Sequence, residues 1–162
     1  MADTTTPDLL RGAIAGVIAG LTASYAMNAF QAALAKLGTP SGASETSSTD
    51  KAANVVAHAA TGHDLTRDAR AAGGQIVHYA VGAALGLGYG VAAEVRPEVR
   101  RGFGTGFGLA TATLLDEAAV PIAGLSGPPS DTPAIGHAYA VASHLVFGAA
   151  LEASRRLVRA LA

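Results

Sequence analysis

Two adjacent carboxylates, Asp116 and Glu117, lie in an otherwise apolar stretch of the sequence, five and four residues before Pro121. Charged groups at such positions are costly inside an apolar helix, so they indicate either a partner or a function. The residues that can partner them also lie within apolar stretches. The complete candidate cluster is Asn28, Gln31, His78, Asp116, Glu117, His137 and His144.

Histidine and carboxylate side chains together support several kinds of chemistry. They can exchange protons or handle a small ion, because histidine titrates near neutrality. They can bind a first-row divalent metal, for which His78, Asp116, His137 and His144 are the candidate ligands, or they can serve a haem. They can also act only as a hydrogen-bonded network between helices, at about 0.6–2 kcal/mol per bond. The residues alone leave these alternatives open.

No catalytic or cofactor motif accompanies this cluster. The chain has no cysteine, which excludes a disulfide, a thiolate metal site and a cysteine nucleophile. It also lacks the His-Glu-x-x-His pattern of zinc hydrolases. The alternating glycines of residues 102–108 superficially resemble a nucleotide-binding loop, but no lysine or preceding strand accompanies them. An enzymatic role is therefore not favoured, and no catalytic residue is assigned.

The elements that position the cluster are four apolar stretches, at about residues 12–35, 76–93, 102–125 and 134–151. Half of the 162 residues are apolar and 14% are charged, against roughly 25% in soluble domains. A helix of about 20 residues crosses the hydrocarbon core of a bilayer. We therefore predict an all-α, four-span transmembrane helical bundle that forms a single membrane domain over residues 1–162. A soluble helical protein rich in alanine and glycine is the alternative.

Small residues recur every four positions along these stretches, a spacing that lets membrane helices approach closely. The series are Gly12, Gly16 and Gly20; Gly82, Gly86 and Gly90; and Gly104, Gly108 and Ala112. Asp116 continues the last series, whereas Glu117 points about 100° away from it on an α-helix. We therefore expect the bundle to pack through glycine faces, with Asp116 as the preferred inward carboxylate. Glu117 is expected to reach either a neighbouring helix or the surface.

A polar segment at residues 38–75 separates the first two predicted spans. Within it, residues 50–60 predict one short helix at the surface, with Ser48 or Thr49 as its N-cap. Val55, Val56 and Ala59 form a thin apolar stripe on this helix.

The distribution of arginine predicts the orientation of the bundle. Six arginines lie in the loop at 94–101 and in the C-terminal tail, whereas the loop at 126–133 has no cation. The positive-inside rule then places both termini in the cytoplasm and the segments 38–75 and 126–133 outside. This orientation puts the candidate cluster near the outer leaflet. The formal net charge of −1 gives no indication of nucleic-acid binding.

Three segments resemble the YagU-like family of small bacterial inner-membrane proteins, which carry a domain of unknown function. They are Asp116-Glu-Ala-Ala-Val-Pro-Ile-Ala-Gly-Leu-Ser-Gly-Pro-Pro129, His78-Tyr-Ala-Val-Gly-Ala-Ala and His144-Leu-Val-Phe-Gly-Ala-Ala. The resemblance covers about residues 9–158. It implies a multi-spanning protein of the bacterial inner membrane, linked to acid tolerance, and it brings no substrate or catalytic mechanism.

The leading hypothesis is a non-enzymatic membrane protein that binds or conducts a proton or a small ion through the cluster. The first alternative is a structural or accessory subunit of a larger membrane complex. The second is a protein that binds a divalent metal or haem. The expected partners are the lipid bilayer and either further copies of the chain or a larger membrane complex.

Overall fold

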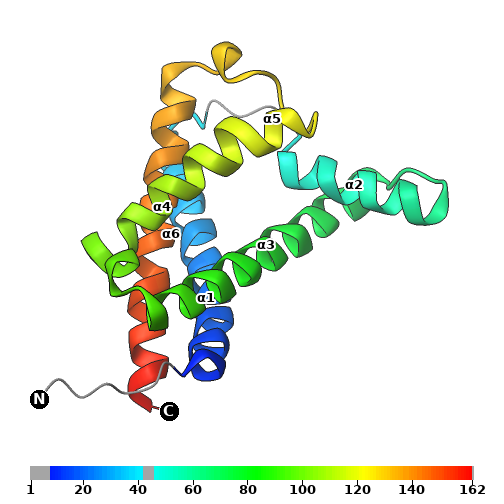
Figure 1. Cartoon of the computed structure of the whole chain (residues 1–162). Helices are drawn as coiled ribbons and strands as arrows, with labels where there is room; N and C mark the ends of the chain where they lie inside the picture. Colours follow the sequence, from blue (N-terminus) through cyan, green and yellow to red (C-terminus); the bar gives the residue numbers. More distant parts are fainter. Residues whose placement is uncertain (1–7, 42–45, 162) are drawn as a thin grey trace, which may run out of the picture.

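The structure is a computed structural model that describes residues 8–41 and 46–161, and this part of the chain is helical without a strand (Figure 1). Three helices are long and apolar enough to cross a membrane: α1 (Leu9–Lys36), α3 (Arg67–Val95) and α6 (Ala134–Leu161). Only 39%, 28% and 33% of the residues in their most apolar windows are buried inside the protein. Most of each apolar surface therefore faces outward, as a lipid environment allows.

The core lies where α1 packs against both α3 and α6. The buried residues of this core are Ala19, Ala23, Met27, Tyr89, Phe147 and Leu151. The start of α1 and the end of α6 lie at the same end of the molecule (Figure 1). Because α1 and α6 run in opposite directions, residues late in α1 lie near residues early in α6.

Glycines occupy the points where backbones come closest. A Cβ atom added at Gly16 would collide with the carbonyl of Gly86 on α3, and one added at Gly20 would collide with the carbonyl of Gly82. On α6, a Cβ added at Gly148 would collide with the carbonyl of Gly104. Larger residues at these positions would force the helices apart.

The short helix of the polar segment is α2 (Ser48–Thr61), and its N-cap is Ser47, not Ser48 or Thr49 as expected. The Ser47 side chain accepts a hydrogen bond from the backbone N–H of Asp50 at 3.1 Å. Val55 and Val56 of the apolar stripe are 59% and 64% exposed, so the stripe is not the face that packs on α3. The buried residue is Ala53, which is small enough to lie over Gly73 of α3.

Two long helices extend beyond their predicted boundaries. Helix α3 begins at Arg67 instead of residue 76, with Thr66 as an N-cap that accepts from Ala69 N–H. Helix α6 continues to Leu161 instead of residue 151. Both added helical segments carry charged residues, so the length of the apolar stretch alone does not predict them. The predicted polar segment 38–75 therefore includes the first turns of α3, and its residues 42–45 lie outside the described part of the chain.

The third predicted span, residues 102–125, is not one uninterrupted helix. The 3₁₀ segment η1 (Pro97–Gly104) ends in three left-handed residues, Gly102, Phe103 and Gly104. Next come α4 (Thr105–Thr111), the π-helix η2 (Ala112–Ala119) and the single turn α5 (Val120–Ile122). At the usual rise, residues 105–122 extend at most about 27 Å, slightly less than a hydrocarbon core.

The break before α4 lies at Gly104, where the absence of a side chain matters twice. Glycine adopts left-handed angles without steric cost, and Gly104 has φ of 80°. Its missing side chain also allows contact with the backbone of Gly148. After this turn, α4, η2 and α5 lead away to the end of the molecule opposite the α6 C-terminus, and the 3₁₀ turn η3 (Pro129–Asp131) connects them to α6 (Figure 1).

Candidate functional site

The π-helix η2 presents both adjacent carboxylates to α6. A π-helix hydrogen-bonds from i to i+5, so neighbouring residues are separated by a smaller angle than on an α-helix. Asp116 and Glu117 each lie within ion-pair distance of a different histidine of α6. The sequence predicts Asp116 as the inward carboxylate, with Glu117 reaching a neighbouring helix or the surface; here Glu117 reaches α6, as Asp116 does. π-helical segments occur frequently at functional sites.

Glu117 pairs with His137 in the first turn of α6. His137 Nδ1 lies 2.7 Å from Glu117 Oε1, and His137 Nε2 lies 3.2 Å from the carbonyl oxygen of Pro129. A carbonyl only accepts, so Nε2 carries a hydrogen and donates it. The contact between Nδ1 and Glu117 then requires one further proton, on either the imidazole or the carboxyl group. About a third of each side chain is exposed, 37% for His137 and 34% for Glu117.

Asp116 pairs with His144, two turns further along α6. The His144 Nδ1 atom donates to the Ala140 carbonyl at 3.0 Å and lies 3.4 Å from Asp116 Oδ2. The His144 side chain is only 10% exposed, whereas that of Asp116 is 38% exposed. Seven residues separate the two histidines, which corresponds to about 10 Å along the helix. The two pairs therefore form a shallow and a deeper site along one face of α6.

The remaining cluster residues lie mainly between α1 and α3. Asn28 donates to Gln75 Oε1 at 2.9 Å, and His78 Nε2 donates to the carbonyl of Ser24 at 3.3 Å. His78 also lies within electrostatic range of His144. Gln31 is half-buried on α1 and joins none of these pairs. Four of the seven predicted residues thus form two histidine–carboxylate pairs, and the other three lie apart from them, with His78 and His144 as the link between the two groups.

The four predicted metal ligands do not form one coordination site. Within residues 8–41 and 46–161, no group of three or more histidine, aspartate or glutamate side chains is close enough to hold a metal ion. Two ligands come together at each histidine–carboxylate pair, which is fewer than the three protein ligands of typical catalytic zinc sites. The arrangement gives the metal hypothesis no support.

A second cluster of ionised groups lies at the opposite end of α6. Glu152 is fully buried and accepts from Tyr89 at 2.9 Å, from Arg155 at 2.8 Å and 3.0 Å, and from Arg156 at 2.6 Å. Arg159 pairs with Glu94 of α3 at 2.9 Å. In the sequence, Glu94 and Glu152 each lie within three residues of an arginine. The tyrosine partner and the complete burial of Glu152 could not be predicted, because they depend on how α3 crosses α6.

Comparison of the chain with protein-family models, with curated proteins and with solved structures gives no match. The likeness to the YagU-like family therefore stays a prediction from the residues quoted above. The function has to be argued from the geometry of the two clusters.

Proposed function

We propose that the chain is an integral protein of the bacterial inner membrane with four spans, in which α4, η2 and α5 together form the third. The close contacts at Gly16, Gly86 and Gly148 support packing through glycine faces. The arginines of η1 and of the end of α6 gather at the end where α1 begins, which supports both termini in the cytoplasm.

Within this bundle, the two histidine–carboxylate pairs of η2 and α6 bind and exchange protons near the outer leaflet. The observation that carries this proposal is the contact between His137 and Glu117. Because Nε2 of His137 donates to Pro129, the pair at 2.7 Å shares one proton between two groups of different chemistry. Such a pair can pass a proton without rearranging the backbone.

The deeper pair extends this path toward the centre of the bundle. Asp116 on η2 and His78 on α3 are the titratable groups that face His144. A proton that enters at the partly exposed His137–Glu117 pair has Asp116 and His144 as its next acceptors, about 10 Å further along α6. A role in acid tolerance, which the family resemblance implies, fits a proton site on the outer side.

The test is proton flux into proteoliposomes that contain the purified protein and a pH-sensitive dye. We expect Asp116→Asn to abolish pH-driven flux while the protein still accumulates and inserts. Asp131→Asn is the matched control, because Asp131 lies in the turn η3, where its side chain accepts a hydrogen bond from Ser130. Equal flux in Asp116→Asn and in the unchanged protein, or no flux in either, would refute proton handling.

Two other outcomes identify the alternative functions. If Asp116→Asn prevents accumulation of the protein, the pairs serve only to hold the helices together. An accessory subunit that docks on a partner or on further copies then becomes the better proposal. Co-purification from detergent tests that role directly. Stoichiometric metal or a haem absorption band in the purified protein, lost in His144→Ala, would assign the cluster to metal or haem binding.

A further inference from the structure

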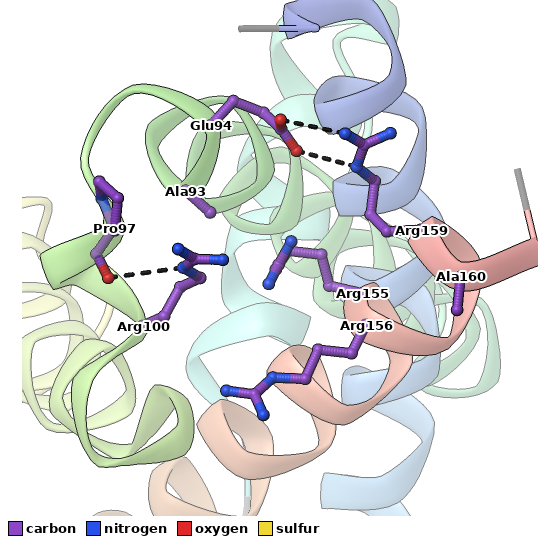
Figure 2. Close-up of a pocket in the computed structure, with 8 residues that line it drawn as sticks. All are labelled: Ala93, Glu94, Pro97, Arg100, Arg155, Arg156, Arg159 and Ala160. Atoms are coloured by element: carbon purple, nitrogen blue, oxygen red, sulfur yellow. Dashed lines mark hydrogen bonds and ion pairs between the residues drawn. The ribbon is translucent and has the colours of Figure 1, made fainter. Parts of the chain in front are cut away.

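An open pocket lies at the end of the bundle where α3 and η1 meet the last turns of α6, far from the histidine pairs. Its cavity volume is about 380 Å³, within the roughly 300–1,000 Å³ typical of ligand sites. Figure 2 shows the charged side chains that line it, contributed by all three elements. They are Glu94, Arg100, Arg155, Arg156 and Arg159.

The arginines outnumber the carboxylates available to neutralise them. Arg159 is paired with Glu94, at 2.9 Å and 3.1 Å. Arg155 and Arg156 share one carboxylate, that of the buried Glu152. Four guanidinium groups therefore meet two carboxylates, and the pocket keeps an excess of two positive charges. Each guanidinium also has five N–H donors, more than these contacts use.

Arg100 has the weakest interactions of the four. Among the described residues no carboxylate lies within ion-pair distance of it, and its Nε donates to the Pro97 carbonyl only at the limiting distance of 3.5 Å. In Figure 2 its guanidinium points toward that of Arg155 across the pocket. Two like charges facing one another repel, and an anion between them would convert this repulsion into attraction.

The pocket is already organised for such an anion. Arg155 is 4% exposed and held by Glu152, so its side chain loses little freedom on binding. The guanidinium of Arg156 lies 4.8 Å from the centre of the Phe103 ring, a cation–π contact that fixes its position. Arginine is suited to phosphate because its planar fork binds two oxygens at once.

We propose that this pocket binds one phosphate group through Arg100, Arg155 and Arg156, and that the group belongs to the headgroup of an anionic phospholipid. Basic pockets between membrane helices on the cytoplasmic side are suited to anionic headgroups. The pocket lies at the ends of α3 and α6, which is the level of the cytoplasmic headgroups in the four-span arrangement proposed above, on which this inference rests. A free phosphate ion shares the same chemistry, so the experiment separates the two sources.

The test counts lipids bound to the full chain, purified and delipidated in a non-ionic detergent, by native mass spectrometry. The probes are dioleoylphosphatidylglycerol and, as the zwitterionic comparison, dioleoylphosphatidylcholine. We expect the anionic lipid to bind preferentially and Arg100→Gln to weaken it about tenfold, the scale of one lost charge-assisted hydrogen bond. Arg101→Gln is the matched control, because it removes the same charge one residue away, outside the pocket lining.

Equal weakening in Arg100→Gln and Arg101→Gln, or equal binding of the two lipids, would overturn the proposal. Inorganic phosphate at millimolar concentration is the second arm. Displacement of the lipid by phosphate, with the same dependence on Arg100, would keep the phosphate site and overturn the lipid as its source. Arg100→Lys keeps the positive charge but loses the planar guanidinium fork, and circular dichroism checks that this variant is folded. Asp116→Asn should leave lipid binding unchanged, which separates this test from that of proton handling.

Discussion

The two ends of α6 hold ionised groups in opposite ways. At the C-terminal end, Glu152 is completely buried, and the arginines that hold it stay charged at any physiological pH. At the N-terminal end, Glu117 and Asp116 are 34% and 38% exposed, and histidines, which titrate near neutrality, hold them. The first arrangement is permanent, whereas the second can change with pH.

The difference indicates what each end contributes. A buried, fully hydrogen-bonded carboxylate fixes α3 relative to α6, because Tyr89 of α3 donates to Glu152 of α6. The partly exposed pairs between η2 and α6 constrain the helices less, and under the proposed function they exchange protons. The end rich in arginine therefore acts as the anchor of the bundle, and the end rich in histidine is the part able to respond.

The largest expected effect comes from removing the charge of Glu152. Glu152→Gln leaves Arg155 buried without its carboxylate, and breaking a buried ion pair costs about 3–5 kcal/mol in the free energy of unfolding. Circular dichroism during unfolding of the detergent-purified protein measures this loss. Glu98→Gln is the control, since Glu98 is exposed on η1. Similar stability of the two variants would mean that the buried cluster is not the anchor.

A smaller effect is expected at the glycine contacts between α1 and α3. A Cβ at Gly86 meets the Gly16 carbonyl, whereas one at Gly88 meets nothing within 4 Å. We expect Gly86→Ala to destabilise the bundle by about 1–3 kcal/mol through overpacking. Gly88→Ala should instead be neutral or stabilise it by about 0.5–1 kcal/mol, because alanine favours the helix. Thermal unfolding of the two variants compares them, and equal effects would contradict close packing of α1 on α3.

The His137–Glu117 pair should contribute less to the free energy of unfolding than either Glu152 or Gly86. Partly exposed ion pairs are typically worth about 0.2–1 kcal/mol. A double-mutant cycle with Glu117→Gln and His137→Gln measures the coupling energy in the same unfolding assay. A coupling as large as the loss in Glu152→Gln would erase the contrast between the ends and favour the hypothesis that the pairs only hold the helices together.

The smallest expected effect lies in the α2–α3 connection, outside the long apolar helices. Hydrogen bonds from Asn54 and His58 hold the pKa of Asp64 below its usual 3.8. A pKa that is lower in the folded state stabilises the fold above the unfolded value, and this contribution disappears as the pH falls through the folded value. We expect amide exchange in α2 to accelerate only below about pH 3.8, the unfolded value. Asp64→Asn should show no such step, and a step retained in this variant would exclude Asp64 as its cause.

Some of this architecture follows from the sequence alone. Local composition predicts helices, because long apolar runs of small residues cannot form another structure that satisfies their backbone in a membrane. The histidines and carboxylates could be selected as candidates because ionisable groups in apolar runs are rare. The four-residue glycine spacing indicated positions that can approach a neighbour, and a Cβ atom at Gly16 or Gly86 would meet the backbone of the facing helix.

Other features were decided only in the tertiary structure. The left-handed turn at Gly104 depends on the approach of Gly148, a residue more than forty positions away, so no local pattern reveals it. The π winding of η2 does not follow from the sequence pattern, nor does the pairing of Glu117 with His137 and of Asp116 with His144. The burial of Glu152 depends on the angle at which α3 crosses α6. The sequence by itself determined which groups are available, and long-range packing decided which of them meet.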